Sequence, residues 1–197
     1  MQQPAAAALA AKQVAKASPR VLVILGVVAV AAYALDQVSK YLVLTNLTLG
    51  ESVAVIDGLL RFQLVKNPGA AFSIGDAYTW IFSILASLVT VFIIWFARRI
   101  KSLGWAVVFG LLLGGVLGNL TDRLFREPGF GVGHVIDFLQ IPILPAIFNI
   151  ADSAIVVSMG FFLILTLRGI GLDGTKTPVE SKKKTELDKT EVDTTDG

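Results

Sequence analysis

Two aspartates in apolar surroundings are the residues of this sequence best suited to do chemistry. Asp152 is the only charged residue in residues 146–167, a run long enough to cross a bilayer as a helix. A carboxylate in a membrane span costs roughly 2.5–3.5 kcal/mol on insertion scales, so it is first interpreted as functional. Asp137, in the apolar segment HVIDFLQI, is its best candidate partner. Like charges held close cannot both ionise, so the pair would share one proton, and could activate water and protonate a leaving group.

Two upstream motifs carry polar groups that could support these carboxylates. Asp36 and Lys40 stand four apart and share one helical face, which indicates a buried ion pair. Alternatively, Lys40 also contacts an anionic lipid or substrate group. Asn67 opens NPGAAFS, where it either caps a turn or hydrogen-bonds a peptide backbone at the membrane surface. Ala70 and Ala71 in this motif permit close packing as the chain re-enters the membrane.

The later polar residues are open to a structural and a functional interpretation. Asn119, Asp122 and Arg123 lie within about one helical turn and either snorkel and cap at the outer membrane boundary or form a set of donors aimed into an active site, where Arg123 holds a carbonyl or orients a carboxylate. Asn149 and Asp152 are three apart, so we expect them on one face of the fourth span, about one turn below its outer end. A salt bridge from Arg123 would give either aspartate, Asp137 or Asp152, a structural role instead.

Residue composition excludes several other chemistries. The chain has no cysteine, so it has neither disulfides nor thiolate chemistry, and its single histidine, His134, is too little for a zinc site. A serine nucleophile lacks its G-x-S-x-G elbow. We expect no metal, no cofactor and no nucleic-acid partner. The main alternative is a proton-coupled transporter or channel subunit, in which Asp137 and Asp152 relay protons.

Four apolar stretches must position these residues. The chain is 54% hydrophobic and 16% charged, which indicates a membrane protein. Stretches of spanning length cover about residues 21–44, 78–97, 103–120 and 146–167. Residues 21–34 also mimic a cleavable signal peptide, but the apolar run continues beyond them and favours a retained helix. We therefore predict an all-α membrane protein with four transmembrane helices.

Charge bias sets the orientation of the four spans. Basic residues precede the first span and fill the turn between the second and third: Lys12, Lys16, Arg20, Arg98, Arg99 and Lys101. Positive flanks stay in the cytoplasm, which places both termini there. We predict a weakly ordered N-terminal extension (1–20), a four-span domain (21–172) and a disordered cytoplasmic tail (173–197).

Two further patterns predict local structure. Within residues 51–66, residues 60–64 alternate apolar and polar side chains and Asp57-Gly58 lies between two apolar arms, which predicts a hairpin and a small β-sheet on the outer membrane face between spans one and two. Gly110, Gly114 and Gly118 form a small-residue face on the third span that lets another helix approach closely.

Five motifs together resemble one known family. DQVSK, NPGAAFS, GNLTDRL, HVIDF and FNIADS occur in the order and spacing of lipoprotein signal peptidase, also called signal peptidase II, of bacterial membranes, and the resemblance covers about residues 21–167. It implies an aspartic endopeptidase that removes the signal peptide from diacylglyceryl-modified prolipoproteins by cutting before the lipidated cysteine. It also implies a multi-pass protein of the bacterial cytoplasmic (inner) membrane with its active site at the outer face.

The resemblance assigns residues and partners as well. The catalytic pair would be Asp137 and Asp152. The residues that bind substrate or support the site would be Asp36, Lys40, Asn67, Asn119, Arg123 and Asn149. Implied partners are diacylglyceryl-prolipoproteins, membrane lipid and globomycin-type cyclic peptide inhibitors. The family's outer-face sheet would correspond to the hairpin segment, and its flexible outer helix to part of the second outer loop, at about residues 121–145.

Overall fold

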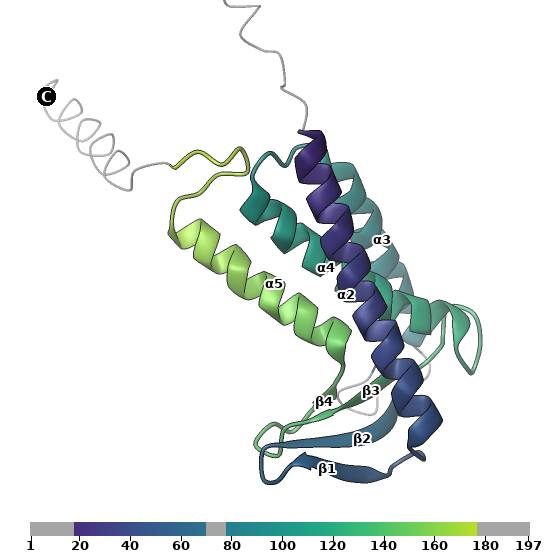
Figure 1. The fold of residues 1–197 in the computed structure, drawn as a ribbon. Helices are drawn as coiled ribbons and strands as arrows, with labels where there is room; N and C mark the ends of the chain where they lie inside the picture. The colour runs from purple at the N-terminus through teal and green to yellow at the C-terminus, as the bar shows by residue number, and fades with distance from the viewer. Residues whose placement is uncertain (1–17, 70–77, 177–197) are drawn as a thin grey trace, which may run out of the picture.

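Four apolar helices form the frame of the protein. The structure, a computed structural model, describes residues 18–69 and 78–176. Its long helices are α2 (Pro19–Asn46), α3 (Thr79–Ala97), α4 (Leu103–Phe125) and α5 (Ile150–Leu167), and each is long and apolar enough to cross a membrane. The four predicted spans are confirmed. Both ends of the described chain lie at the end of the helices away from the β-sheet (Figure 1).

Several sequence-based predictions fall wholly or mainly outside the described residues. These are the close packing at Ala70 and Ala71, the N-terminal extension and most of the C-terminal tail.

The first span can be followed from its beginning: α2 runs through Ala32 and Ala34 without interruption. At the other end of the chain, residues 170–176 fold back as a turn that closes with a bridge between Ile170 and Lys176.

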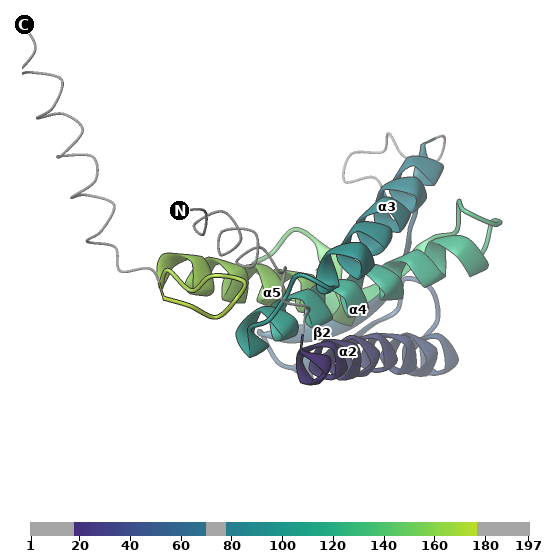
Figure 2. The same cartoon turned by 90° about the horizontal axis from the view of Figure 1, so that it is seen from above.

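Glycines let α4 lie in contact with two neighbouring helices. Gly114 faces α2, where a Cβ atom would lie 2.5 Å from the carbonyl oxygen of Ala29. Gly115 faces α5, where a Cβ atom would lie 2.6 Å from the carbonyl oxygen of Ala151. Any side chain there would push the helices apart. The predicted small-residue face of α4 is therefore confirmed, and it packs against α2. Gly115 allows the same close packing against α5, so α4 lies between α2 and α5 (Figure 2).

A four-stranded antiparallel sheet lies across one end of the helices, here called the sheet end (Figure 1). Its strands are β1 (Ser52–Ile56), β2 (Leu60–Asn67), β3 (Val135–Gln140) and β4 (Ile147–Phe148), in that order. The predicted hairpin is confirmed as β1 and β2, joined by a turn in which Gly58 has φ +73°. Only glycine adopts this conformation without strain.

The second connection corrects two predictions. The sheet is not confined to the chain between spans one and two, because β3 and β4 come from the connection between α4 and α5. The flexible helix implied for this connection is also not there, since residues 126–149 form turns and strands. The physical reason is HVIDFLQI: its continuous apolar run suits a strand buried on both faces, and β2 supplies its hydrogen-bonding partner.

A small apolar core fixes the sheet against the helices. Val43 of α2, Leu64 of β2, and Ile136 and Phe138 of β3 are all buried and pack together. Because successive side chains of a strand point to opposite faces, this packing directs Asp137 to the other face of β3. The sheet thus brings one aspartate of the predicted pair to the ends of the helices.

Candidate active site

Asp137 is a buried carboxylate held by two amide side chains. It lies in β3 with 2% of its surface exposed. Its Oδ2 accepts a hydrogen bond from Asn67 Nδ2 (2.7 Å), and its Oδ1 accepts one from Asn149 Nδ2 (2.6 Å). Burial raises the pKa of Asp137 from 3.8 to about 6, against the lowering effect of the Asn67 hydrogen bond, and the nearby charge of Asp152 raises it as well. This aspartate can therefore hold a proton well above the usual pH range.

Asp152 lies in the first turn of α5 and is partly exposed. It forms a capping box with Asn149: Asn149 Oδ1 accepts from the Asp152 N–H (2.9 Å), and Asp152 Oδ2 accepts from the Asn149 N–H (3.1 Å). Its other oxygen, Oδ1, accepts from Asn119 Nδ2 (2.8 Å). The carboxylate thus sits at the positive end of a helix dipole, which favours negative charge.

The position predicted for Asn149 is wrong by one turn. Asn149 is the N-cap of α5 with extended backbone and does not lie inside the span. The helix starts later than its apolar sequence indicates because Ile147 and Phe148 pair with β3 as β4. Asp152 consequently lies at the very end of its helix, at the depth of the sheet.

Asn149 joins the two aspartates directly. Its Nδ2 donates to Asp137 Oδ1 and to Asn119 Oδ1 (3.1 Å), while its backbone N–H donates to Asp152. We call Asp137 and Asp152, with the amides of Asn67, Asn119 and Asn149, the amide-held pair. Within residues 18–69 and 78–176, no Lys, Arg or His forms an ion pair with either aspartate. Two buried or half-buried carboxylates therefore stand together without a countercharge in contact.

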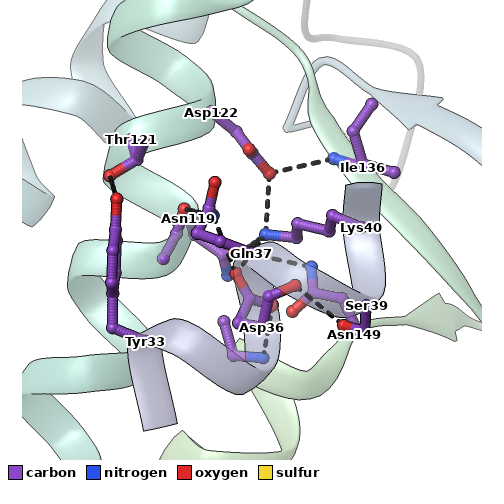
Figure 3. Close-up of polar contacts among 12 residues, drawn as sticks. Tyr33, Asp36, Gln37, Ser39, Lys40, Asn119, Thr121, Asp122, Ile136 and Asn149 are labelled. Carbon is purple, nitrogen blue, oxygen red and sulfur yellow. Dashed lines mark hydrogen bonds and ion pairs between the residues drawn. The ribbon is translucent and has the colours of Figure 1, made fainter. Parts of the chain in front are cut away.

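Lys40 is the centre of a second polar group (Figure 3). Its Nζ contacts Asp36 Oδ2 (2.8 Å), Asp122 Oδ2 (2.7 Å) and Asn119 Oδ1 (3.0 Å). The side chains of Lys40, Asp36 and Asp122 are fully buried. The predicted Asp36–Lys40 ion pair is therefore present. An ammonium group has three donors and all three are used, so the geometry favours the structural interpretation of Lys40 over a contact with lipid or substrate.

From the sequence, Asp122 is grouped with Asn119 and Arg123, but its ion pairs are not predicted. Besides Lys40, its carboxylate accepts from Arg126 Nε (2.5 Å) and from the Ile136 N–H of β3 (3.2 Å). Its spacing of four residues before Arg126 was the available signal. We call Asp36, Lys40, Asp122 and Arg126 the ion-pair cluster.

The ion-pair cluster also reaches the start of α5. Asp36 Oδ1 accepts from the Ala151 N–H (2.9 Å), one of the first-turn donors that the helix itself leaves unsatisfied. The cluster therefore ties together α2, α4, α5 and β3, the four elements that carry or border the aspartates.

Arg123 is nearly buried beside the amide-held pair. It donates to the carbonyl oxygen of Pro68 (3.4 Å) and lies over the ring of Phe82, 5.2 Å from its centroid. The salt bridge considered as a structural explanation for either aspartate is not among the ion pairs of the described residues. Next to Pro68, Asn67 Oδ1 accepts from the Gly69 N–H (2.8 Å), which turns its Nδ2 towards Asp137. Arg123 thus fixes the loop that orients Asn67.

The fold and the site together define a class: a multi-pass membrane protein that carries a carboxylate pair suited to acid–base chemistry where its helices meet a sheet. Comparison with known proteins makes this class specific. The chain belongs to the signal peptidase II family, because the model of the family described as "Signal peptidase (SPase) II" matches residues 28–168. It is therefore a peptidase.

Individual relatives agree with this assignment. A lipoprotein signal peptidase of Leifsonia xyli subsp. xyli is 68% identical over 159 residues, which cover 81% of this chain and 74% of that protein. One of Streptomyces griseus is 48% identical over 169 residues, covering 86% and 85% of the two chains. A solved bacterial membrane enzyme structure, 29% identical, superposes with a TM-score of 0.67 over 78% of this chain and 96% of that one.

Proposed function

We propose that this protein is an intramembrane aspartic endopeptidase that removes the signal peptide from diacylglyceryl-modified prolipoproteins, cutting before the lipidated cysteine. The observation that carries this proposal is the amide-held pair, in which Asp137 and Asp152 share Asn149 as a partner and, among the described residues, form no ion pair with a cation. Family membership and relatives named lipoprotein signal peptidase support the substrate class. They give no support to the proton-coupled transporter considered from sequence.

The reaction needs one proton on the pair. The raised pKa of Asp137 suits it to hold that proton, and the helix N-terminus at Asp152 favours the negative charge that the pair retains. Asp152 takes a proton from a water molecule, whose oxygen attacks the scissile carbonyl. Asp137 hydrogen-bonds the oxygen of the resulting tetrahedral intermediate. As the intermediate collapses, a proton passes to the leaving amine of the lipidated cysteine and the C–N bond breaks.

The remaining site residues position these groups. Asn67 and Arg123 border the Pro68 carbonyl next to Asp137, where they would position the substrate peptide. Asn119 and Asn149 hold the carboxylates, and Asp36 and Lys40 in turn hold Asn119 and the start of α5. We assign these last two residues a supporting role without substrate contact.

The distribution of basic residues supports an outer-face active site. Arg20 starts α2, and Arg98, Arg99 and Lys101 form the turn between α3 and α4, all at the end away from the sheet. The positive-inside rule places that end, and both termini, in the cytoplasm. The amide-held pair would then face the outside of the bacterial cytoplasmic membrane, with membrane lipid around it. Globomycin-type cyclic peptides would bind at the pair and inhibit cleavage.

Cleavage of a diacylglyceryl-modified prolipoprotein by purified protein in detergent tests the proposal. Asp137→Asn and Asp152→Asn should each lower kcat by a factor of about 10³ or more, since each loses an acid or base role in the transition state. Asp57→Asn, an exposed aspartate in the hairpin turn, is the matched control and should retain full activity. Substantial cleavage by either site variant, with circular dichroism showing it folded, would contradict the proposal.

A further inference from the structure

A pocket of about 280 Å³ lies at the sheet end, on the face of β3 opposite to Asp137. Its polar lining includes Lys66 of β2, Arg126 and Glu127 just after α4, and His134 just before β3. Ile136 lines it too, and because Ile136 and Asp137 are consecutive in one strand, their side chains point to opposite faces. The pocket is therefore separate from the amide-held pair.

Two side chains of this pocket have hydrogen-bond donors to spare. Arg126 contacts Asp122 only through Nε, and its two terminal amino groups have no partner in the described part of the chain. The ring nitrogens of His134 also have no hydrogen-bond partner in the described part of the chain. The hydrogen bond of this residue is made by its backbone N–H, which donates to the Glu127 carbonyl oxygen (2.9 Å). The guanidinium and the imidazole can thus both donate to a ligand.

The other basic side chain of the pocket, Lys66, has a partner that can be displaced. Lys66 Nζ lies 3.0 Å from Glu127 Oε2, but the Glu127 side chain is 84% exposed and that of Lys66 is 40% exposed. Exposed ion pairs contribute little to stability, so an entering anion can replace Glu127 at little cost. The two buried carboxylates of the ion-pair cluster, Asp36 and Asp122, are balanced by Lys40 and Arg126 together, so the cluster as a whole does not repel such an anion strongly.

The donors suit the oxygen atoms of a phosphate group. An Arg fork binds two oxygens of a tetrahedral anion, and a Lys and a His add point donors. The position adds a second indication. The pocket lies where α2 and α4 leave their apolar spans, the depth of phospholipid headgroups, and Phe125 beside it is an exposed apolar side chain.

We propose that this pocket binds a phosphate ester, and that a glycerophospholipid headgroup of the surrounding membrane is its source. The site uses no residue of the amide-held pair. The proposed phosphate site can therefore be tested independently of the proposed peptidase activity.

Calorimetric titration of the purified full-length protein in detergent tests this with three probes. Dioctanoyl phosphatidylglycerol carries the phosphate on acyl chains, dioctanoylglycerol has the same chains without phosphate, and glycerol 3-phosphate is the soluble headgroup. We expect phosphatidylglycerol to bind at least about 10-fold more tightly than dioctanoylglycerol, the ratio that one charge-assisted hydrogen bond can supply.

Four variants locate the site. His134→Gln and Arg126→Gln should weaken binding of phosphatidylglycerol at least about fivefold, whereas Glu127→Gln should tighten it about threefold because Lys66 loses its competing carboxylate. Arg168→Gln, a basic residue at the opposite end of the molecule, is the control and should change nothing. If these two residues only stabilised the fold, His134→Gln and Glu127→Gln would not change the affinity for phosphatidylglycerol in opposite directions.

The results decide both the site and its source. Phosphatidylglycerol binding with little glycerol 3-phosphate binding supports a lipid headgroup, and equal binding of the two supports a soluble phosphate ester. Equal affinity for phosphatidylglycerol and dioctanoylglycerol would overturn the proposal, as would unchanged affinity in both His134→Gln and Glu127→Gln. These two variants remain decisive if Arg126→Gln fails to fold for want of its Asp122 contact.

Discussion

The protein places two groups of carboxylates at the same end of its helices and surrounds them differently. In the ion-pair cluster, Asp36 and Asp122 are fully buried and both contact Lys40. In the amide-held pair, Asp137 and Asp152 receive hydrogen bonds from neutral amides and, among the described residues, contact no cation. Asp137 is buried almost as completely as Asp36 and Asp122, whereas Asp152 is partly exposed, so burial does not separate the two groups. The nature of the partner does.

This difference in partners separates the carboxylates that hold the site together from those that perform its chemistry. A carboxylate that a buried cation contacts is fixed in place by that ion pair, whereas one held by neutral amides can exchange a proton. Asn119 connects the two groups, since its Oδ1 accepts from Lys40 and its Nδ2 donates to Asp152. The charged group thus orients an amide, and the amide orients the carboxylate without neutralising it.

The largest expected effect comes from removing the shared cation of the ion-pair cluster. Lys40→Met leaves Asp36 and Asp122 buried without their shared cation, and breaking a buried ion pair costs about 3–5 kcal/mol. We expect that loss in the free energy of unfolding, measured in mixed micelles. Lys66→Met is the matched control and should cost at most about 1 kcal/mol, because its ion pair is exposed. Equal losses in the two variants would mean that the cluster does not hold the site.

A smaller effect concerns the packing that holds the cluster. In Gly118→Ala the new Cβ would lie 2.5 Å from Asp36 Oδ2 and 3.1 Å from the Ala151 Cβ. Relieving this crowding should cost about 1–3 kcal/mol of stability. Gly26→Ala on α2 has no atom within 4 Å of its Cβ and should be neutral or stabilising by up to about 1 kcal/mol. If both variants unfold alike, the close approach at Gly118 does not support the cluster.

The smallest effect tests the amide side of the comparison. The Asn67 hydrogen bond lowers the pKa of Asp137, so Asn67→Ala should raise it. If activity needs one proton on the pair, kcat/KM falls as pH rises through about 6, and in Asn67→Ala this fall should move to higher pH by up to about one unit. Asn46→Ala, at an exposed helix end, is the control. A shift to lower pH would contradict the proposed proton on the pair.

Much of this arrangement could be predicted from the sequence. Apolar runs of spanning length predicted the helices, and the Asp36–Lys40 spacing predicted their ion pair, because both depend on the local geometry of a helix. The Asp57-Gly58 turn predicted the hairpin for a similarly local reason.

The missed features depend on contacts between distant segments. Nothing in the residues of HVIDFLQI itself shows that this segment pairs with β2. The two strands are far apart in the sequence, since Asn67 and Asp137, which share a hydrogen bond, are 70 residues apart. The same pairing, continued by β4, delays the start of α5 and makes Asn149 a helix cap. Asp122 likewise gained its role only when α2 brought Lys40 against α4.

The most direct test of a proton-holding carboxylate pair is an infrared titration of the protonated carboxyl signal. We predict a band that is lost with a midpoint near pH 6, is missing in Asp137→Asn and is unchanged in Asp57→Asn. In Asp152→Asn the midpoint should fall, because the negative charge that raises the pKa of Asp137 is gone. The absence of a band with a midpoint near pH 6, or its persistence in Asp137→Asn, would contradict the proposal that these two carboxylates share a proton.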